Sequence, residues 1–122
     1  MLNISIEQTD DVLYCRVTGS NSVQNVIHYL NELHAAMEKY ALRKVLIEEN
    51  LSGKSLSIVE MFHVIRTANK TILSLPHQIA YVDINPEHNH DNLKFAETAA
   101  FNRWINMRLF STVDNAEKWL QQ

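Results

Sequence analysis

The stretch KVLIEENLSGKSLSIVEMF, residues 44–62, decides the fold class, because a strand, a loop and the start of a helix follow one another in it. Its first part, residues 44–49, is a short and mainly apolar run that predicts a buried strand. From Ile58 onward, apolar residues recur at helical spacing. Just before them, Ser57 and Glu60 have the spacing of a capping box, which marks a helix start. The stretch therefore predicts one strand-loop-helix unit of an α/β protein.

The same two periodicities continue on both sides of this unit. Near the start of the chain, two alternating segments separated by the turn-like TDD predict an antiparallel hairpin. After the hairpin, helical stripes alternate with short strands, and the apolar run QIAYVDI is typical of an interior parallel strand. The predicted elements are strands at 2–8, 12–17, 44–49, 78–84 and 107–110 and helices at 23–40, 58–72, 93–104 and 113–120.

This order, β-β-α-β-α-β-α-β-α, predicts a single α/β domain over residues 1–122. Strands that alternate with helices form a mostly parallel sheet with right-handed crossovers. We therefore expect a five-stranded sheet in which only the N-terminal strand is antiparallel. The sequence contains no linker, repeat or low-complexity segment that would divide the chain.

Composition argues against several classes of protein. Of the 122 residues, 46% are apolar and 20% are charged, which is the composition of an ordinary globular domain. The net charge of −3 argues against a nucleic-acid partner, because such a partner requires a basic surface. No run comes near the roughly 20 apolar residues that span a bilayer, so a transmembrane protein is not expected. The single cysteine, Cys15, rules out an internal disulfide, and the N-terminus has no pattern of a secretion signal. The expected location is the cytoplasm.

The loop contains Gly-Lys-Ser, the end of a phosphate-binding motif, but the rest of that motif is absent. The pattern G-x-x-x-x-G-K-[ST] requires a glycine where this chain has Glu48, with Glu49 beside it, and two carboxylates repel phosphate oxygens. Nucleotide hydrolysis is therefore not expected. The capping box accounts for Ser57, whereas Gly53 and Ser55 have no role in it.

The leading hairpin, the loop with serines at positions 52, 55 and 57, and the ending MRLFSTVDNAEKWLQQ resemble the STAS domains, the SpoIIAA-like fold of bacterial anti-sigma-factor antagonists. In the antagonists, a serine at the start of the helix after the third strand is phosphorylated, and this switches partner binding. The resemblance implies that the candidate phospho-switch or binding loop contains Gly53, Lys54, Ser55 and Ser57, with Ser55 as the switch residue. The alternative is that these residues only form the start of a capped helix.

Histidines near position 90 are a further candidate site. His88, His90 and Asp91 could offer ligands to a metal, but one short loop cannot complete a tetrahedral site. We therefore expect a solvated loop, with Asp91 as the cap of the third helix, and neither a metal nor a cofactor.

Other reactive or aromatic side chains are expected to be structural. Cys15 lies among apolar residues of a predicted strand and is expected to pack as a small hydrophobe. Trp104, Ile105, Phe110 and Trp119 are expected to pack in the core, with a partner-binding patch as the alternative.

Together these features predict a non-catalytic cytoplasmic module that acts in regulation or binding through a protein partner or a small ligand. A second hypothesis is a carrier of an apolar small molecule in a pocket between helix and sheet, since the SpoIIAA-like group also resembles the lipid-binding CRAL-TRIO fold. An enzyme that uses His63 or the loop from His88 to His90 is a third hypothesis and ranks last. The edge of the first strand lacks Pro and Lys, so we also expect a homodimer.

Overall fold

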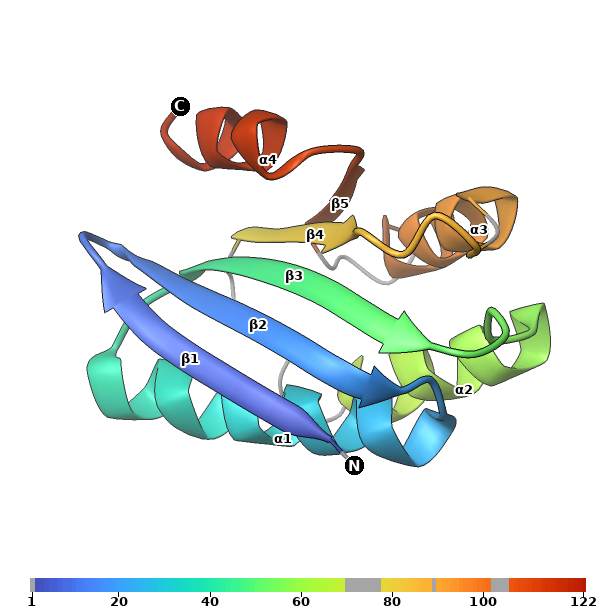
Figure 1. The fold of residues 1–122 in the computed structure, drawn as a ribbon. Coiled ribbons are helices and arrows are strands. Elements are labelled where there is room, and N and C mark those ends of the chain that lie inside the picture. Colours follow the sequence, from blue (N-terminus) through green and yellow to red (C-terminus); the bar gives the residue numbers. More distant parts are fainter. Residues whose placement is uncertain (1, 70–77, 89, 102–105) are drawn as a thin grey trace.

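The computed structural model describes residues 2–69, 78–88, 90–101 and 106–122. In these residues the chain forms one five-stranded sheet and four helices (Figure 1). In chain order they are β1 (Asn3–Thr9), β2 (Val12–Ser20), α1 (Val23–Tyr40), β3 (Lys44–Ser52), α2 (Ile58–Asn69), β4 (Gln78–Asp83), α3 (His90–Phe101), β5 (Met107–Phe110) and α4 (Val113–Leu120). The predicted order of elements is confirmed.

The strands lie in the order β1-β2-β3-β4-β5. The pair β1–β2 is antiparallel and the three other pairs are parallel, as predicted. The apolar strand β4 lies between β3 and β5, where both of its faces are covered. Because β2, β3, β4 and β5 run in one direction, their carboxyl ends lie at the same end of the sheet.

The alternation of side chains along β3 divides the core into two clusters. Val45 and Ile47 face the larger cluster, which α1, α2 and α3 cover, whereas Leu46 faces the smaller cluster under α4. Figure 1 shows α1 and α2 on one side of the sheet and α4 on the other. Phe110 and Trp119 pack against the smaller cluster with their ring centroids 5.5 Å apart, which confirms their predicted place in the core.

Three helices begin at the residues that the sequence indicated. The Ser22 hydroxyl accepts a hydrogen bond from the Asn25 N–H at the start of α1 (3.1 Å), and Thr112 caps α4 in the same way. The capping box of α2 is also formed, since Ser57 and Glu60 each bond the other's backbone N–H. In the described part of the chain, no helix is long and apolar enough to cross a membrane.

The boundaries of β1 and β4 differ from the prediction by one residue, and larger differences occur in β2, β3 and α3. β2 and β3 continue to Ser20 and Ser52, beyond their predicted ends, because the two strands pair along their whole length and need no apolar pattern there. α3 begins at His90, so Asp91 lies in its first turn and does not precede it as a cap. The predicted end of the second helix at residue 72 and the predicted core residues Trp104 and Ile105 lie outside the described residues.

Candidate functional site

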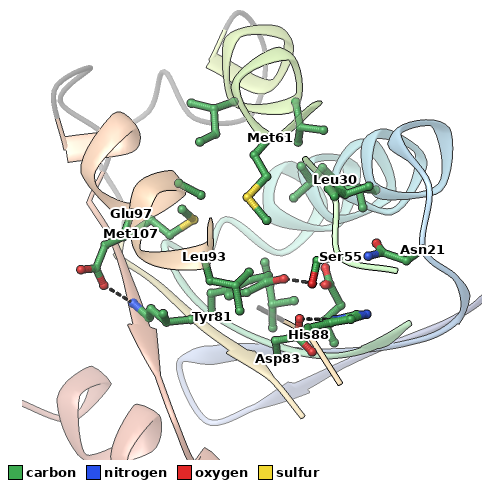
Figure 2. Close-up of a pocket in the computed structure, with 18 of the residues that line it drawn as sticks. Asn21, Leu30, Ser55, Met61, Tyr81, Asp83, His88, Leu93, Glu97 and Met107 are labelled. Atoms are coloured by element: carbon green, nitrogen blue, oxygen red, sulfur yellow. Dashed lines mark hydrogen bonds and ion pairs between the residues drawn. The ribbon is translucent and has the colours of Figure 1, made fainter. Parts of the chain in front are cut away.

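A cavity of about 90 Å³ lies between the sheet and helices α1, α2 and α3 (Figure 2). It adjoins the carboxyl ends of β3 and β4, which is the usual place for a ligand in an open α/β sheet. Its apolar walls include Leu30 from α1, Met61, Val64 and Ile65 from α2, and Leu93 and Ala96 from α3. Its polar end includes Asn21, Glu49, Ser55, Asp83 and His88. The cavity therefore combines an apolar chamber with a cluster of titratable groups.

Glu49 is the most deeply buried carboxylate of this cluster, with 3% of its surface exposed. Two tyrosine hydroxyls donate hydrogen bonds to it, one from Tyr29 on α1 and one from Tyr81 on β4. Burial raises the pKa of Glu49 to about 7, although both hydrogen bonds act in the opposite direction by favouring the charged form. Glu49 is therefore partly protonated near neutral pH.

Asp83 and His88 form a second buried pair beside Glu49. His88 Nδ1 lies 2.6 Å from Asp83 Oδ2, and the two side chains are only 1% and 2% exposed. The other ring nitrogen, Nε2, lies 3.1 Å from the Gly53 carbonyl and 3.3 Å from Asn85 Nδ2. A charged ring can donate to both Asp83 and Gly53, whereas a neutral ring with its proton on Nδ1 can accept from Asn85. The position of the ring protons thus determines whether Nε2 is hydrogen-bonded to the Gly53 carbonyl or to Asn85.

The loop after β3 is held by its backbone carbonyls. Four successive carbonyls face donors from other segments of the chain. They are Leu51 O with Asn85 Nδ2 at 2.7 Å, Ser52 O with Asn21 N at 2.8 Å, Gly53 O with His88 Nε2 at 3.1 Å, and Lys54 O with Asn21 Nδ2 at 2.9 Å. Because Asn85 and His88 also contact Asp83, the loop and the buried cluster form one hydrogen-bonded network.

The four residues predicted for the loop site lie in different environments. The space around Gly53 would admit a side chain, since an added Cβ would meet nothing within 4 Å. The backbone explains the glycine instead, because its φ of +102° is a conformation that residues with a side chain rarely adopt. Ser55 is half-buried and borders the cavity. Lys54 and Ser57 are exposed, and the Ser57 hydroxyl caps α2. The structure therefore places Gly53 and Ser55 beside the buried cluster and the other two residues at the surface.

The buried cluster itself was not predicted. The expectation of a solvated loop is wrong for His88, which is 4% exposed because Asp83 holds its ring inside the fold. The sequence carried a partial signal, since Glu49 and Asp83 each come after the apolar run of a predicted strand. The structure adds that the two residues are direct partners in the parallel register of β3 and β4. His63, named with the enzyme hypothesis, is exposed on α2 and does not line the cavity.

Glu49, Asp83 and His88 also have the chemistry of metal ligands. One oxygen or nitrogen from each lies within 4.8 Å of the others, which distinguishes this group among the described residues. In the structure, however, Glu49 accepts from both tyrosines and Asp83 accepts from His88. A metal ion would have to displace these hydrogen bonds, so the arrangement fits a hydrogen-bonded network better than a metal centre.

Exposed apolar side chains lie at the same end of the sheet as the loop. Ile58 and Val59, in the first turn of α2, are 45% and 79% exposed, and Ile84, directly after β4, is 43% exposed. Ile84 adjoins β3 through a hydrogen bond from its N–H to the Glu49 carbonyl. Large exposed apolar side chains beside a structured loop are typical of a surface that contacts a partner.

The antiparallel hairpin, the parallel strands that follow it and the loop between β3 and α2 define the SpoIIAA-like, or STAS, fold. An anti-sigma factor antagonist from Mycobacterium paratuberculosis shares it with a TM-score of 0.61 and 13% identity, over 100% of this chain and 96% of that one. RsbS from Moorella thermoacetica, solved as a serine-to-glutamate variant, has a TM-score of 0.55 and 16% identity over 98% of both chains.

A third similar structure is an uncharacterized protein with a SpoIIAA-like fold from Shewanella loihica. It has a TM-score of 0.52 and 16% identity, over 98% of this chain and 93% of that one. No protein-family model and no curated protein matches the sequence. At these identities the likeness concerns the fold alone, and it confirms the fold that the sequence resemblance implied.

Proposed function

We propose that this chain is a non-catalytic regulatory module that binds a protein partner through the loop of residues 50–57 and the first turn of α2. The exposure of Val59 beside this loop is the observation that carries the proposal. Apolar side chains with a polar rim form the energetic centre of many interfaces, and Lys54 supplies a charged neighbour. The likeness to an anti-sigma factor antagonist and to RsbS supports a role in regulation.

A pull-down from a lysate of the host cell tests this surface. The variant Val59→Asp places a charge at the centre of the surface without touching the core, so it should lose the partner that the parent chain recovers. Tyr40→Asp is the matched control, because Tyr40 is 43% exposed at the other end of α1, away from the loop. Equal recovery by the parent and both variants would exclude the surface.

Within this surface, Ser55 is the proposed switch residue. It lies between the exposed Lys54 and the start of α2, where the helix dipole favours an anion, so a phosphate would have two sources of stabilisation. On its inner side Ser55 borders the acidic cavity, so a phosphate would also change how the loop packs. Ser55→Asp should alter partner recovery while Ser55→Ala does not. If both variants fold and bind as the parent does, the loop is only the start of a helix.

A second candidate function is the carriage of a small apolar molecule. The observation that favours it is the cavity between the helices and the sheet, whose walls are mostly apolar. Native mass spectrometry of protein purified from its own host should then show a retained small-molecule mass. Substitution of Ala96 by Leu, which fills the chamber, should remove that mass. A parent chain that carries no ligand would contradict this function.

The proposal includes a cytoplasmic location and a homodimer. The free thiol of Cys15 is compatible with the reducing cytoplasm, where we place the protein. A homodimer is proposed through β1, which lies at the edge of the sheet and pairs with β2 on one side.

A further inference from the structure

We propose that the cavity selects a small apolar molecule whose polar end is a hydrogen-bond donor, with a protonated amine preferred to a hydroxyl and an anionic group rejected. This inference rests on the second candidate function and specifies its ligand. It follows from the sign of the charges around the cavity, from the hydrogen bonds already formed there and from the size of the chamber.

The titratable groups that line the cavity are mainly acidic. Three carboxylates, those of Glu49, Asp83 and Glu97, border it, and His88 is the only residue among the described lining residues that can carry positive charge. No lysine or arginine belongs to that described lining. His88 is paired with Asp83 and also acts on Glu49, but one imidazole cannot balance three carboxylates, so the lining remains acidic. A ligand carboxylate or phosphate would be buried beside these groups without a counter-charge, which is strongly unfavourable.

The hydrogen bonds around the cavity lead to the same conclusion. Tyr29 and Tyr81 donate their hydroxyl protons to Glu49, so neither proton is available to a ligand. In contrast, the buried Oδ1 of Asn21 has no hydrogen-bond partner, and its Nδ2 is bonded to the Lys54 carbonyl. Carboxylate oxygens can each accept more than one hydrogen bond. The cavity therefore offers the unpartnered Asn21 oxygen and several carboxylate oxygens as acceptors, which favours a ligand whose polar end is a donor.

The size of the chamber limits the apolar part of the ligand. By the same measure a water molecule needs about 10–15 Å³, so the volume of about 90 Å³ has room for a short alkyl chain or a single ring. Met61 from α2 and Leu93 from α3 point into this space above Asp83 and His88 (Figure 2). The ligand would place its apolar part between the helices and its polar end toward the carboxyl ends of the strands.

The titration of Glu49 gives the binding a pH dependence. An ammonium group beside Glu49 favours its ionised form, and the pKa of about 7 means that this form grows as pH rises past neutrality. The titratable groups that face Glu49 are Cys15 from β2, Tyr29 from α1, Tyr81 and Asp83 from β4, and His88 from the following loop. Affinity for an amine should therefore increase between about pH 6 and pH 8, while affinity for an alcohol should change less.

The test uses three compounds that share one alkyl chain, namely hexylamine, 1-hexanol and hexanoate, added to the full chain with isotope-labelled methionine methyl groups. Met61 and Met107 line the cavity, whereas Met37 is buried in the same core away from it and is the internal reference. Hexylamine should shift the Met61 and Met107 signals and leave Met37 unchanged. It should bind at least about ten-fold more tightly than hexanoate.

Two variants show where the compounds bind. Ala96→Leu fills the chamber and should abolish binding, and Ala36→Leu, at a partly buried position of α1 outside the cavity, should not. Glu49→Gln should reduce the preference for the amine. If hexanoate binds the parent as tightly as hexylamine, the inference about the polar end is wrong and the carrier function stands. If none of the compounds shifts Met61 or Met107, both the inference and the carrier function fall.

Discussion

Glu49 has an environment that carboxylates rarely occupy, since it is enclosed by two tyrosines and a second acid at the centre of the fold. The folded pKa of about 7 lies above the ordinary 4.5, so the folded chain keeps a proton that the unfolded chain loses between these values. The free energy of unfolding therefore falls as pH rises through this window, by about 3 kcal/mol in total, and stays lowered above it.

The variant Glu49→Gln should remove this contribution. An amide can accept from one tyrosine and donate to the other, so the network is retained without a titrating group. Measured by chemical denaturation, the stability of the variant relative to the parent should rise by up to about 3 kcal/mol between about pH 4.5 and pH 8. Glu48→Gln is the matched control, because Glu48 faces the other side of the sheet and leaves Glu49 in place. A difference that does not vary with pH would contradict the prediction.

His88 and Asp83 should show strong energetic coupling, because each is the buried partner of the other. His88→Ala leaves the Asp83 carboxylate buried without its partner and should destabilise the chain by about 3–5 kcal/mol. Asp83→Asn combined with His88→Ala should cost less than the sum of the two single changes, by about 1–3 kcal/mol.

The exposed pair His28–Glu32 on α1 is the control for this double-mutant cycle. Its side chains are 61% and 56% exposed, and its coupling should stay below about 0.5 kcal/mol. Hydrogen exchange of residues 51–54 in His88→Ala provides a second measurement, because the loop loses the contact at Gly53. Equal coupling in the two pairs would contradict the prediction that burial strengthens the interaction of His88 with Asp83.

At the scale of elements, the start of α2 depends on the box formed by Ser57 and Glu60, whose two hydrogen bonds are 2.9 and 3.1 Å long. Ser57→Ala removes the cap and should lower the free energy of unfolding by about 0.5–2 kcal/mol. Ser57→Asp should retain most of the stability, since aspartate is an equally good cap. Chemical denaturation of both variants gives their free energies of unfolding. A loss in Ser57→Ala that Ser57→Asp does not show is due to the missing cap and not to the serine itself. If Ser57→Ala is as stable as the parent, the box contributes nothing to the helix.

At the scale of the whole molecule, the free edge of β1 predicts a homodimer. β1 has no proline or lysine to oppose pairing, and its exposed residues are small or polar, namely Asn3, Ser5, Glu7, Gln8 and Thr9. Light scattering at high protein concentration should give the mass of two chains. Ser5→Lys should shift the equilibrium toward the monomer without a change in stability. A monomeric mass for the parent at high concentration would contradict the prediction.

The elements were predictable because each carries a local pattern. Alternating residues specified β1 and β2, helical stripes specified α1 and α2, and the cap at Ser57 formed where the sequence indicated. The ends of β2 and β3 were not predictable in this way. They are stabilised by backbone pairing with each other, from Thr18 with Asn50 to Ser20 with Ser52, which leaves no trace in the pattern of side chains.

By itself the sequence determined the order of the elements, the parallel arrangement of most of the sheet and the position of the loop after β3, because hydrophobic periodicity and capping act over a few neighbouring residues. Only the tertiary structure decided the cluster of Glu49, Asp83 and His88. Its members come from two strands and a following loop. Helix α1 and the two tyrosines bury them, and only there do hydrogen bonds connect Glu49 with the tyrosines and Asp83 with His88. Desolvation, which raises the pKa of Glu49, exists only once the helices have covered the sheet.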